Sequence, residues 1–545
     1  MNILALINEN SGSCYHRLYT SLKYIGADFV DKLDTNIVKG YDILWINRNC
    51  VTSPATLSLW REMFGLKIVF DLDDSLVIPD HYPGSQKMKP LVGKVVDRLI
   101  EADWVVVSTK DLVKEVLPYN TNVSVIPNRI DYKYFKCKEE TFKEFSQRKI
   151  RVGFIGAFTH YYDWKEIKGW MKTLVSNPYF KENCEFVMGG YNDTAKEYWR
   201  DFADLGKFIK SLSVNEYLRL FQEFDIILCP LVDNQFNRAK SSLRVLEAGT
   251  HNCVCILDSL YKDKSDCPDL GHIYAEKDKD WFDEPLRLVQ NRLNLWQLKN
   301  WTGIKARQLD FQEIVKMRKE VVTKVKDVKK IETKYDIYSI RYDDKQPYEY
   351  KNYLNKVKTV QEKSWRFEYN VMLDVIPKSD TKGWIGLMSW KFPLKTLISK
   401  KKLEYILNNN EGYDCIVLCK HLNQPYLRFT EKQHPGFMYL FTQVCKDLGL
   451  PSNEPKHTIY SNFFVLKGDL YRKYVEEVVI PVTELLEGKY WKLTNRDAQY
   501  KAGLDKEKLL QFTGMEYYNF YTFILERLIG QWVMKNKLKV LNVFQ

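Results

Sequence analysis

FDIILCPLVDNQFNRAKSSLRVLEAGTHNCVCILD, residues Phe224–Asp258, begins and ends near a short apolar run and carries a polar loop and a helical pattern between them. The runs Ile226–Cys229 and Cys253–Leu257 have the length and the apolar content of buried strands. The segment between them is long enough for the helical crossover that two parallel strands require. This stretch therefore predicts a β-α-β unit of a parallel sheet.

The same alternation of strand-like and helical patterns continues outward on both sides, and the charged stretch Lys136–Lys149 divides it into two series. The first series contains Asn2–Ile7, Ile43–Ile46, Lys67–Phe70, Trp104–Val107 and Val123–Ile126, and the second contains Arg151–Ile155, Cys184–Met188, Ile226–Cys229 and Cys253–Leu257. We predict an α/β protein with two Rossmann-like domains, 1–148 and 149–334, and a third α/β domain, 335–545. The lysine-rich helix predicted at Phe311–Thr333 ends the second domain. Ligands of such sheets bind beyond the carboxyl ends of the strands.

The composition is that of a globular protein, with 545 residues, 45% hydrophobic and 28% charged. Lys and Arg (82) exceed Asp and Glu (70) by 12, which fits a solvated basic face or an anionic partner. The 11 cysteines form no C-x-x-C pair and several, including Cys229 and Cys415, lie in apolar runs, which indicates reduced thiols in a cytoplasmic protein. No apolar run approaches the roughly 18 residues of a membrane span, and the first residues read as a strand and loop rather than a signal peptide.

The helix of the opening stretch carries the residues most suited to chemistry. Ser241 or Ser242 is the predicted N-cap, and Lys240, Arg244 and Glu247 are spaced to share one helical face. Free backbone N–H groups and these cations would bind a diphosphate, to which Arg238 adds charge. Glu247 could accept hydrogen bonds from ribose hydroxyls. A surface helix with an Arg–Glu pair fits the same residues equally well.

The pattern N-x-x-K-S-x-x-R-x-x-E-x-G, Asn237–Gly249, resembles the nucleotide-sugar site of retaining glycosyltransferases with the GT-B fold. Further segments that resemble this family, in the same order, are GSCYHR (Gly12–Arg17), ADWVVVSTKDL (Ala102–Leu112), VSVIPNRID (Val123–Asp131) and VGFIGAFTHYYDW (Val152–Trp164). The resemblance covers about residues 1–320. It implies two Rossmann-like domains that face each other, an acceptor-side first domain and a donor-binding second domain.

The resemblance also implies the reaction: transfer of a sugar from a nucleotide diphosphate sugar, foremost a UDP-sugar, with retention and with no obligatory metal or other cofactor. The acceptor would be a surface glycan, a lipid-linked saccharide or, in a phage protein acting in the host cytoplasm, a modified base in DNA. A catalytically silent glycan- or nucleic-acid-binding protein on the same fold is the alternative without an activity.

The residue roles follow from the same resemblance. The implied catalytic residues are His160, Lys240 and Asp73. The implied donor-binding residues are Gly156, Thr159, Asn237, Arg238, Ser241, Arg244 and Glu247, and the implied acceptor-side residues are Gly12, Ser13, His16, Arg17, Asp71 and Asp74. Ala239 stands where the family often has an acidic residue, so Asn237 is the candidate sugar contact at that place. Thr159 as a helix cap beside an incidental His160 is the structural alternative.

FDLDDSL, Phe70–Leu76, supports a second hypothesis. It resembles the first motif of haloacid-dehalogenase-type phosphatases, in which Asp71 would be the nucleophile and Asp73 the acid, and it also resembles the D-x-D motif of GT-A glycosyltransferases. Two earlier β-α units precede it, whereas the phosphatase motif belongs to the first strand of its sheet. In the transferase hypothesis this loop faces the cleft and orients the acceptor hydroxyl, and loop capping is the structural alternative.

The region after residue 335 is rich in Tyr, Lys and Asn. It contains predicted strands at Trp384–Ser389, Ile416–Leu418 and Phe463–Leu466 and predicted helices at Gly468–Leu486 and Tyr517–Met534. It weakly resembles glycosyltransferase-associated or GT-A-like domains. Acceptor recognition, a second transferase module and a structural appendage remain open, and Trp384, Trp390, Lys391 and Lys395 would suit a polar or anionic polymer.

Overall fold

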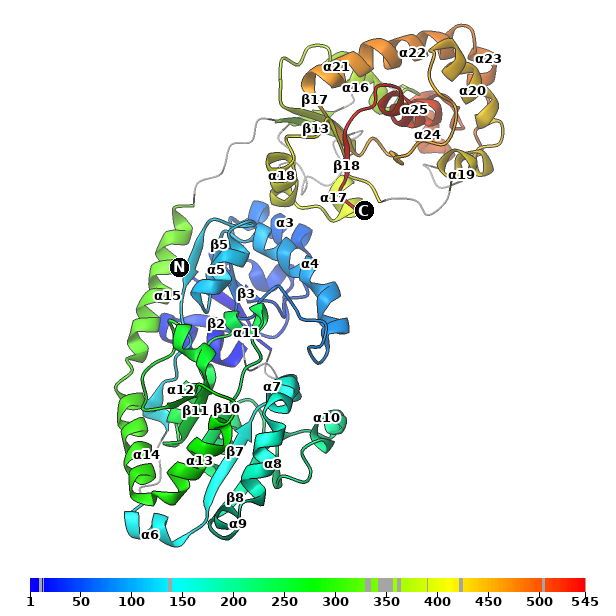
Figure 1. Ribbon diagram of the computed structural model, residues 1–545. Coiled ribbons are helices and arrows are strands. Elements are labelled where there is room, and N and C mark those ends of the chain that lie inside the picture. Colours follow the sequence, from blue (N-terminus) through cyan, green and yellow to red (C-terminus); the bar gives the residue numbers. More distant parts are fainter. Residues whose placement is uncertain are drawn as a thin grey trace. The chain divides into compact units, whose positions relative to one another are not determined.

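The computed structural model describes residues 1–8, 12, 14–135, 140–328, 335–341, 356–359, 364–389, 391–420, 425–501 and 505–544 (Figure 1). The chain forms two compact units. The first unit comprises Met1–Thr52 and Phe64–Val328, and the second comprises Ser53–Met63 and Lys329–Gln545. Ser13 and Trp390 lie outside the described residues.

The first sheet is parallel and has the order β2-β1-β3-β4-β5-β6. Its strands are β1 (Ile3–Leu6), β2 (Ala27–Val30), β3 (Ile43–Asn47), β4 (Lys67–Leu72), β5 (Trp104–Val107) and β6 (Val123–Val125). β1, β3 and β5 are almost entirely apolar and buried, as a sheet covered on both faces requires. The order reverses between β1 and β3, and open α/β sheets bind their ligands beside such a reversal.

The second sheet is also parallel, with the order β12-β11-β10-β7-β8-β9. Its strands are β7 (Ile150–Ile155), β8 (Cys184–Tyr191), β9 (Lys207–Lys210), β10 (Ile226–Cys229), β11 (Val254–Asp258) and β12 (Ile273–Ala275). If the six strands are numbered in chain order and read from β9, the order is 3-2-1-4-5-6, the doubly wound topology of dinucleotide-binding domains. The strand order reverses between β7 and β10. The stretch Phe224–Asp258 forms β10, helices α11 (Gln235–Ala239) and α12 (Leu243–Gly249), and β11.

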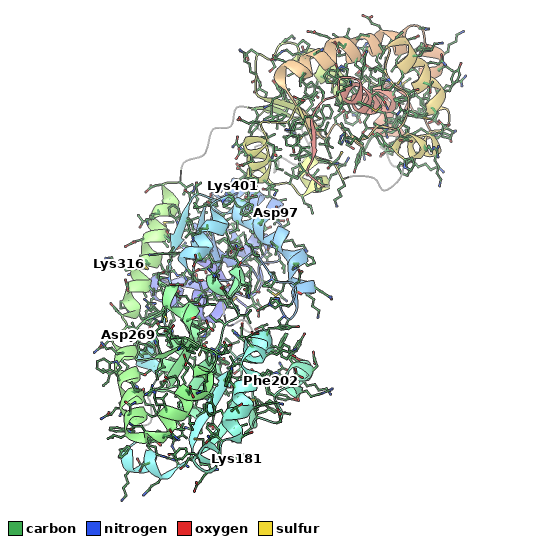
Figure 2. The ribbon with its side chains drawn as sticks, viewed as in Figure 1. Asp97, Lys181, Phe202, Asp269, Lys316 and Lys401 are labelled. Atoms are coloured by element: carbon green, nitrogen blue, oxygen red, sulfur yellow. The ribbon has the colours of Figure 1, made fainter. Side chains whose placement is uncertain are left out.

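The lysine-rich helix α15 (Phe311–Lys326) packs on the first sheet, not on the second one that precedes it in sequence (Figure 1). Ile314, Val321 and Val325 join the core of β1, β3 and β4. The lysines lie on the other face, where Lys316, labelled in Figure 2, is exposed. The basic run is therefore the solvated face of a helix that ties the two sheets of the first unit together.

The second unit contains a mixed sheet of order β14-β13-β15-β17-β16-β18. Its strands are β13 (Tyr335–Arg341), β14 (Lys356–Thr359), β15 (Trp384–Ser389), β16 (Cys415–Val417), β17 (Phe464–Lys467) and β18 (Val540–Asn542). β17 is antiparallel to both neighbours, and the other pairs are parallel. The long helix α25 (Tyr521–Lys535) is buried in the core of this unit.

The fold class predicted from the sequence, two Rossmann-like domains followed by a third α/β domain, is confirmed by these three sheets. The four cysteines that lie in apolar runs of the sequence, Cys229, Cys253, Cys255 and Cys415, are buried. Among the described residues, no helix combines the length and the apolar character needed to cross a membrane.

Candidate functional site

The two strand-order reversals of the first unit face each other across a narrow interface. His16 lies in the π-helical segment η1 (Cys14–Tyr19) that follows β1, and its Nε2 is 3.9 Å from Oε1 of Glu247 on α12. Hydrogen bonds also cross the interface: for example, Asn128 Nδ2 donates to Ser241 Oγ at 2.6 Å, and Thr109 Oγ1 donates to the Ala239 carbonyl at 2.9 Å. The loops predicted to form the donor and acceptor sides therefore lie against one another.

Lys240 stands in the turn between α11 and α12 with extended backbone, so the predicted helical face is shared only by Arg244 and Glu247. Its Nζ is buried and has no hydrogen-bond partner among the described residues. The aromatic rings of Tyr82 and Phe236 lie 5.7 and 5.1 Å from that nitrogen. Burial lowers the pKa of Lys240, an effect that the nearby Asp163 and Asp74 oppose. Burying an ammonium group without a hydrogen-bond partner costs free energy of folding, which indicates that a bound anion pairs with Lys240.

Lys264 and Asp266 hold the turn that carries Lys240. Lys264 Nζ donates to the carbonyl oxygens of Asn237, Arg238 and Lys240 at 2.8, 2.9 and 2.6 Å, which satisfies the end of α11. Asp266 accepts from the Ser242 backbone N–H at 2.8 Å. Burial lowers the pKa of Lys264 to about 8, against the effect of Asp266.

We expect Lys264→Met to lower turnover by about 10- to 100-fold, because the loosened turn misplaces Lys240. Only the ammonium form has donors for all three carbonyl groups, so wild-type turnover should decline above pH 8, near the pKa of about 8. Lys264→Arg should restore part of the turnover and remove this decline. Exposed Lys277 provides the matched control, Lys277→Met. Equal turnover and pH profiles for all four proteins would show that Lys264 has no positioning role.

Arg244 lies against the carboxyl end of β7. Its Nη1 donates to the Ile155 carbonyl, and its Nε is 3.3 Å from Glu247 Oε2. Gly156 follows at once, and a Cβ there would stand 3.2 Å from Arg244 Nη2 and 3.1 Å from His160 Cδ2. A glycine here lets the Arg244 and His160 side chains pack directly against the backbone at the end of β7.

Glu247 and His16 are both shifted toward their neutral forms. Burial raises the pKa of Glu247 to about 7, against the effect of Arg244, and burial lowers the pKa of His16 to about 4. A carboxyl group that titrates near neutral pH in a domain interface is a candidate ligand contact.

His160 belongs to a hydrogen-bonded chain. Its Nδ1 is 3.0 Å from Asp163 Oδ2, and Asp163 Oδ1 accepts from Asn237 Nδ2 at 2.8 Å and from the Val232 backbone N–H at 3.0 Å. Burial, and then Lys240, lowers the pKa of His160 to about 4, so the free imidazole is neutral at pH 7. Asn237 orients Asp163 and donates again to the Val232 carbonyl, so both its donors are engaged within the protein.

The loop after β4 contacts the second domain through His81 and Tyr82. Tyr82 and Thr159 line the same small pocket, and the ring of Tyr82 lies 4.6 Å from that of Phe236. The ring of His81 lies 5.2 Å from that of Tyr162. Tyr82 therefore covers Lys240 from the first-domain side, a role that no local sequence pattern indicated.

Asp71 is engaged deep in the first domain. It is 1% exposed, and its two carboxylate oxygens pair with Arg17 Nε at 2.6 Å and Arg318 Nη1 at 2.5 Å. Asp74 pairs with Arg48 at 2.5 Å, whereas burial raises the pKa of Asp73 to about 6 against the effect of Arg48. A nucleophile must reach its substrate, so this burial of Asp71 does not support the phosphatase hypothesis.

The structure thus gathers His16, Gly156, His160, Lys240, Arg244 and Glu247 at one interface. Arg238 is not among them, because its side chain is 61% exposed and pairs with Asp233 at 2.5 Å. Gly12 is exposed, Ser13 lies outside the described residues, and Arg17 is buried against Asp71. The described residues include no group of three or more His, Cys, Asp or Glu side chains that could hold a metal ion.

No protein-family model and no curated protein matches this sequence. Several solved structures are similar to it. HepE from Anabaena in complex with UDP and glucose is 13% identical, with a TM-score of 0.42 over 59% of this chain and 100% of that chain. TarM is 14% identical (TM-score 0.37; 52% of this chain and 54% of that chain). The UDP-forming trehalose-phosphate synthase from Burkholderia vietnamiensis is 12% identical (TM-score 0.37; 52% and 70%).

Proposed function

We propose that the first unit is a GT-B glycosyltransferase that transfers a sugar from a nucleotide diphosphate sugar to an acceptor. The observation that carries this proposal is the buried Lys240 ammonium group, which has no hydrogen-bond partner among the described residues and stands where two Rossmann-like sheets face each other. An anion bound there would lie beside Arg244 and His160. A diphosphate leaving group fits this concentration of positive charge at the carboxyl ends of β7 and β10.

Lys240 and Arg244 would stabilise the charge that develops on the leaving diphosphate as the sugar carbon becomes oxocarbenium-like. A bound phosphate would raise the low pKa of His160, and Asp163 would then hold the imidazolium in place. Asp73, with its pKa of about 6, would orient the acceptor hydroxyl from the first domain. Retention of configuration is part of this proposal.

The donor class is tested by incubating the full chain with UDP-, GDP- and ADP-sugars and measuring the release of the nucleoside diphosphate. We expect release from UDP-sugars, the class implied by the sequence resemblance, at the slow rate of donor hydrolysis when no acceptor is present. A protein that neither binds nor hydrolyses any donor of this panel would contradict the proposal.

Glu247 would bind the ribose hydroxyls as a carboxylate, and this predicts a pH dependence. Because the pKa of Glu247 is about 7, affinity for UDP-glucose should rise between pH 6 and pH 8. A charge-assisted hydrogen bond is more stable than a neutral one by about 1 kcal/mol, so we expect the dissociation constant of UDP-glucose to change about fivefold. Titration calorimetry of wild type and Glu247→Gln measures it, and the variant should show a flat profile. A wild-type profile retained in the variant would assign the titration to another group, such as Asp73.

Two classes of acceptor can be separated by experiment, a glycan or lipid-linked saccharide and a modified base in DNA. We propose that the domain 335–545 recognises the acceptor. If the acceptor is DNA, binding of the full chain to duplex DNA should weaken steeply as salt rises, because phosphate contacts release counterions. Transfer of labelled sugar to a glycan, without salt-dependent DNA binding, would select the first class.

A further inference from the structure

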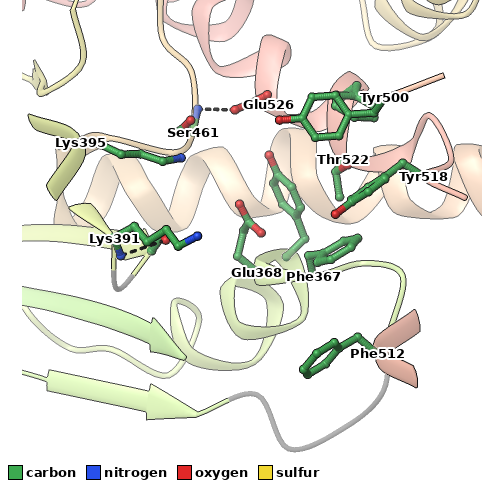
Figure 3. A pocket seen from close by; sticks show the side chains of 13 residues that line it. Phe367, Glu368, Lys391, Lys395, Ser461, Tyr500, Phe512, Tyr518, Thr522 and Glu526 are labelled. Atoms are coloured by element: carbon green, nitrogen blue, oxygen red, sulfur yellow. Dashed lines mark hydrogen bonds between the residues drawn. The ribbon is translucent and has the colours of Figure 1, made fainter. Parts of the chain in front are cut away.

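The second unit has a pocket of its own, about 330 Å³ in volume (Figure 3). Ser389, the last residue of β15, and Lys391, which follows it closely, line one side. The order β14-β13-β15 means that the chain leaves β13 for one neighbour and later returns on the other side of it. The pocket therefore lies at the carboxyl end of a strand beside a reversal of strand order, the place where open α/β sheets bind ligands.

Two lysines and two glutamates share this pocket. Lys391 and Lys395, the N-cap and a residue of α17 (Phe392–Thr396), are exposed, and Figure 3 shows their ammonium ends directed toward Glu368. Asn462 Nδ2 donates to Glu368 Oε1 at 3.1 Å. Glu526 accepts from the Ser461 backbone N–H and pairs with Arg527. Carboxylates only accept hydrogen bonds, so a ligand for them must bring donors, and the lysines select an anionic group.

Aromatic side chains form the opposite side of the pocket. Tyr500, Tyr518 and Phe512 stand there in Figure 3. The rings of Phe367 and Tyr518 stack at 5.7 Å and 10°, and Tyr500 meets Tyr518 edge-on at 5.2 Å. Tyr500 is 40% exposed. Rigid, partly exposed tyrosines offer flat apolar faces with polar edges, which suit a ring that has apolar C–H faces and hydroxyl rims.

The backbone around the pocket is strained. Phe367 has φ of 48° and ψ of −128°, and Ser461 and Asn462 both have positive φ, 56° and 53°. Such a backbone conformation is unfavourable for a residue with a side chain and persists only where the surroundings fix it. Here the strained residues are lining residues themselves or hold Glu368, so the strain maintains the positions of the groups that face the pocket.

We propose that this pocket binds a saccharide that carries an anionic group. The sugar ring packs against Tyr500 and Tyr518, its hydroxyls donate to Glu368 and Glu526, and its phosphate or carboxylate group is held by Lys391 and Lys395. The binding is independent of the first unit. If the proposed function of the first unit holds, this saccharide is the acceptor or a part of it.

The test uses the full chain with Lys240→Met, which removes the buried ammonium group on which the proposed donor site of the first unit depends. It is applied to an array of mono- and disaccharides, each in a neutral, a phosphorylated and a uronate form, and hits are measured by calorimetry alongside inorganic phosphate. We expect at least one anionic saccharide to bind at least tenfold more tightly than both its neutral form and inorganic phosphate. The phosphorylated and uronate forms identify the source of the anion.

The variant Lys391→Gln/Lys395→Gln should bind the anionic saccharide at least tenfold more weakly, and Lys391→Arg/Lys395→Arg should keep the wild-type affinity. Both lysines are exposed, and Lys432→Gln, on another exposed lysine, is the matched control. The proposal is overturned if no anionic saccharide exceeds its neutral form, or if the double glutamine variant binds as well as the control. The donor assay on the otherwise wild-type chain fails or succeeds separately, so the two proposals are distinguishable.

Discussion

Replacement of Lys240 by methionine is expected to lower the turnover of the nucleotide sugar by about 10²- to 10³-fold, the usual effect of removing one group that stabilises transition-state charge. Methionine keeps the unbranched apolar stem between the rings of Tyr82 and Phe236 but has no charge. The ammonium group has no protein partner among the described residues, so its removal leaves no acceptor unsatisfied. The melting temperature should therefore stay equal or rise while turnover falls.

Turnover and the melting temperature of wild type, Lys240→Met and the exposed control Lys277→Met decide the matter. Opposite effects on activity and stability are the signature of a charge kept for its ligand. If Lys240→Met turned over within about threefold of the control, or melted well below it, the ammonium group would have a structural role instead, and the diphosphate would have to bind elsewhere.

The sequence predicted the interior strands except β13, and among the edge strands it predicted only β6. β5, β10 and β15 begin and end at the predicted residues, because each is a short run of fully or nearly fully apolar residues. β2 and β9, each at a sheet edge, were not predicted. Their residues are half-buried or exposed, so their composition has no apolar run to mark them. Their positions are set by pairing with β1 and β8, and a local sequence pattern holds no information about such pairing.

The candidate site divides in the same way. Lys240, Arg244 and Glu247 could be found because they are close in sequence and lie on one turn and helix. Lys264, Asp266 and Tyr82 could not, because each acts on this turn from a distant part of the chain. In FDLDDSL, by contrast, a local motif suggests a chemical role that contacts from distant residues do not support. Its motif suggests a reactive Asp71, but Arg17 and Arg318, 54 and 247 residues away, occupy both oxygens.

Asp71→Asn should destabilise the first unit by about 3–5 kcal/mol, the cost of removing one partner from a buried ion pair. Arg17 and Arg318 would be left close together and buried, without the carboxylate that joins them. Because Arg318 lies on α15, the loss should loosen that helix from β4. Hydrogen exchange should show reduced protection of β4 and α15, while amides of the second unit serve as the internal control.

The same pair predicts an acid dependence. Burial alone would raise the pKa of Asp71, but Arg17 and Arg318 outweigh it and hold the pKa below its ordinary 3.8. The stabilisation is therefore fully present above pH 3.8 and is lost as pH falls through the lowered folded-state pKa. Asp71→Asn should lack this part of the acid transition, whereas Asp111→Asn, which breaks an exposed pair with Lys114, should keep it. No phosphorylated Asp71 should be detected by mass spectrometry, since neither carboxylate oxygen is accessible. A stable Asp71→Asn protein would contradict the structural role of Asp71, and an aspartyl phosphate would show that Asp71 is a nucleophile.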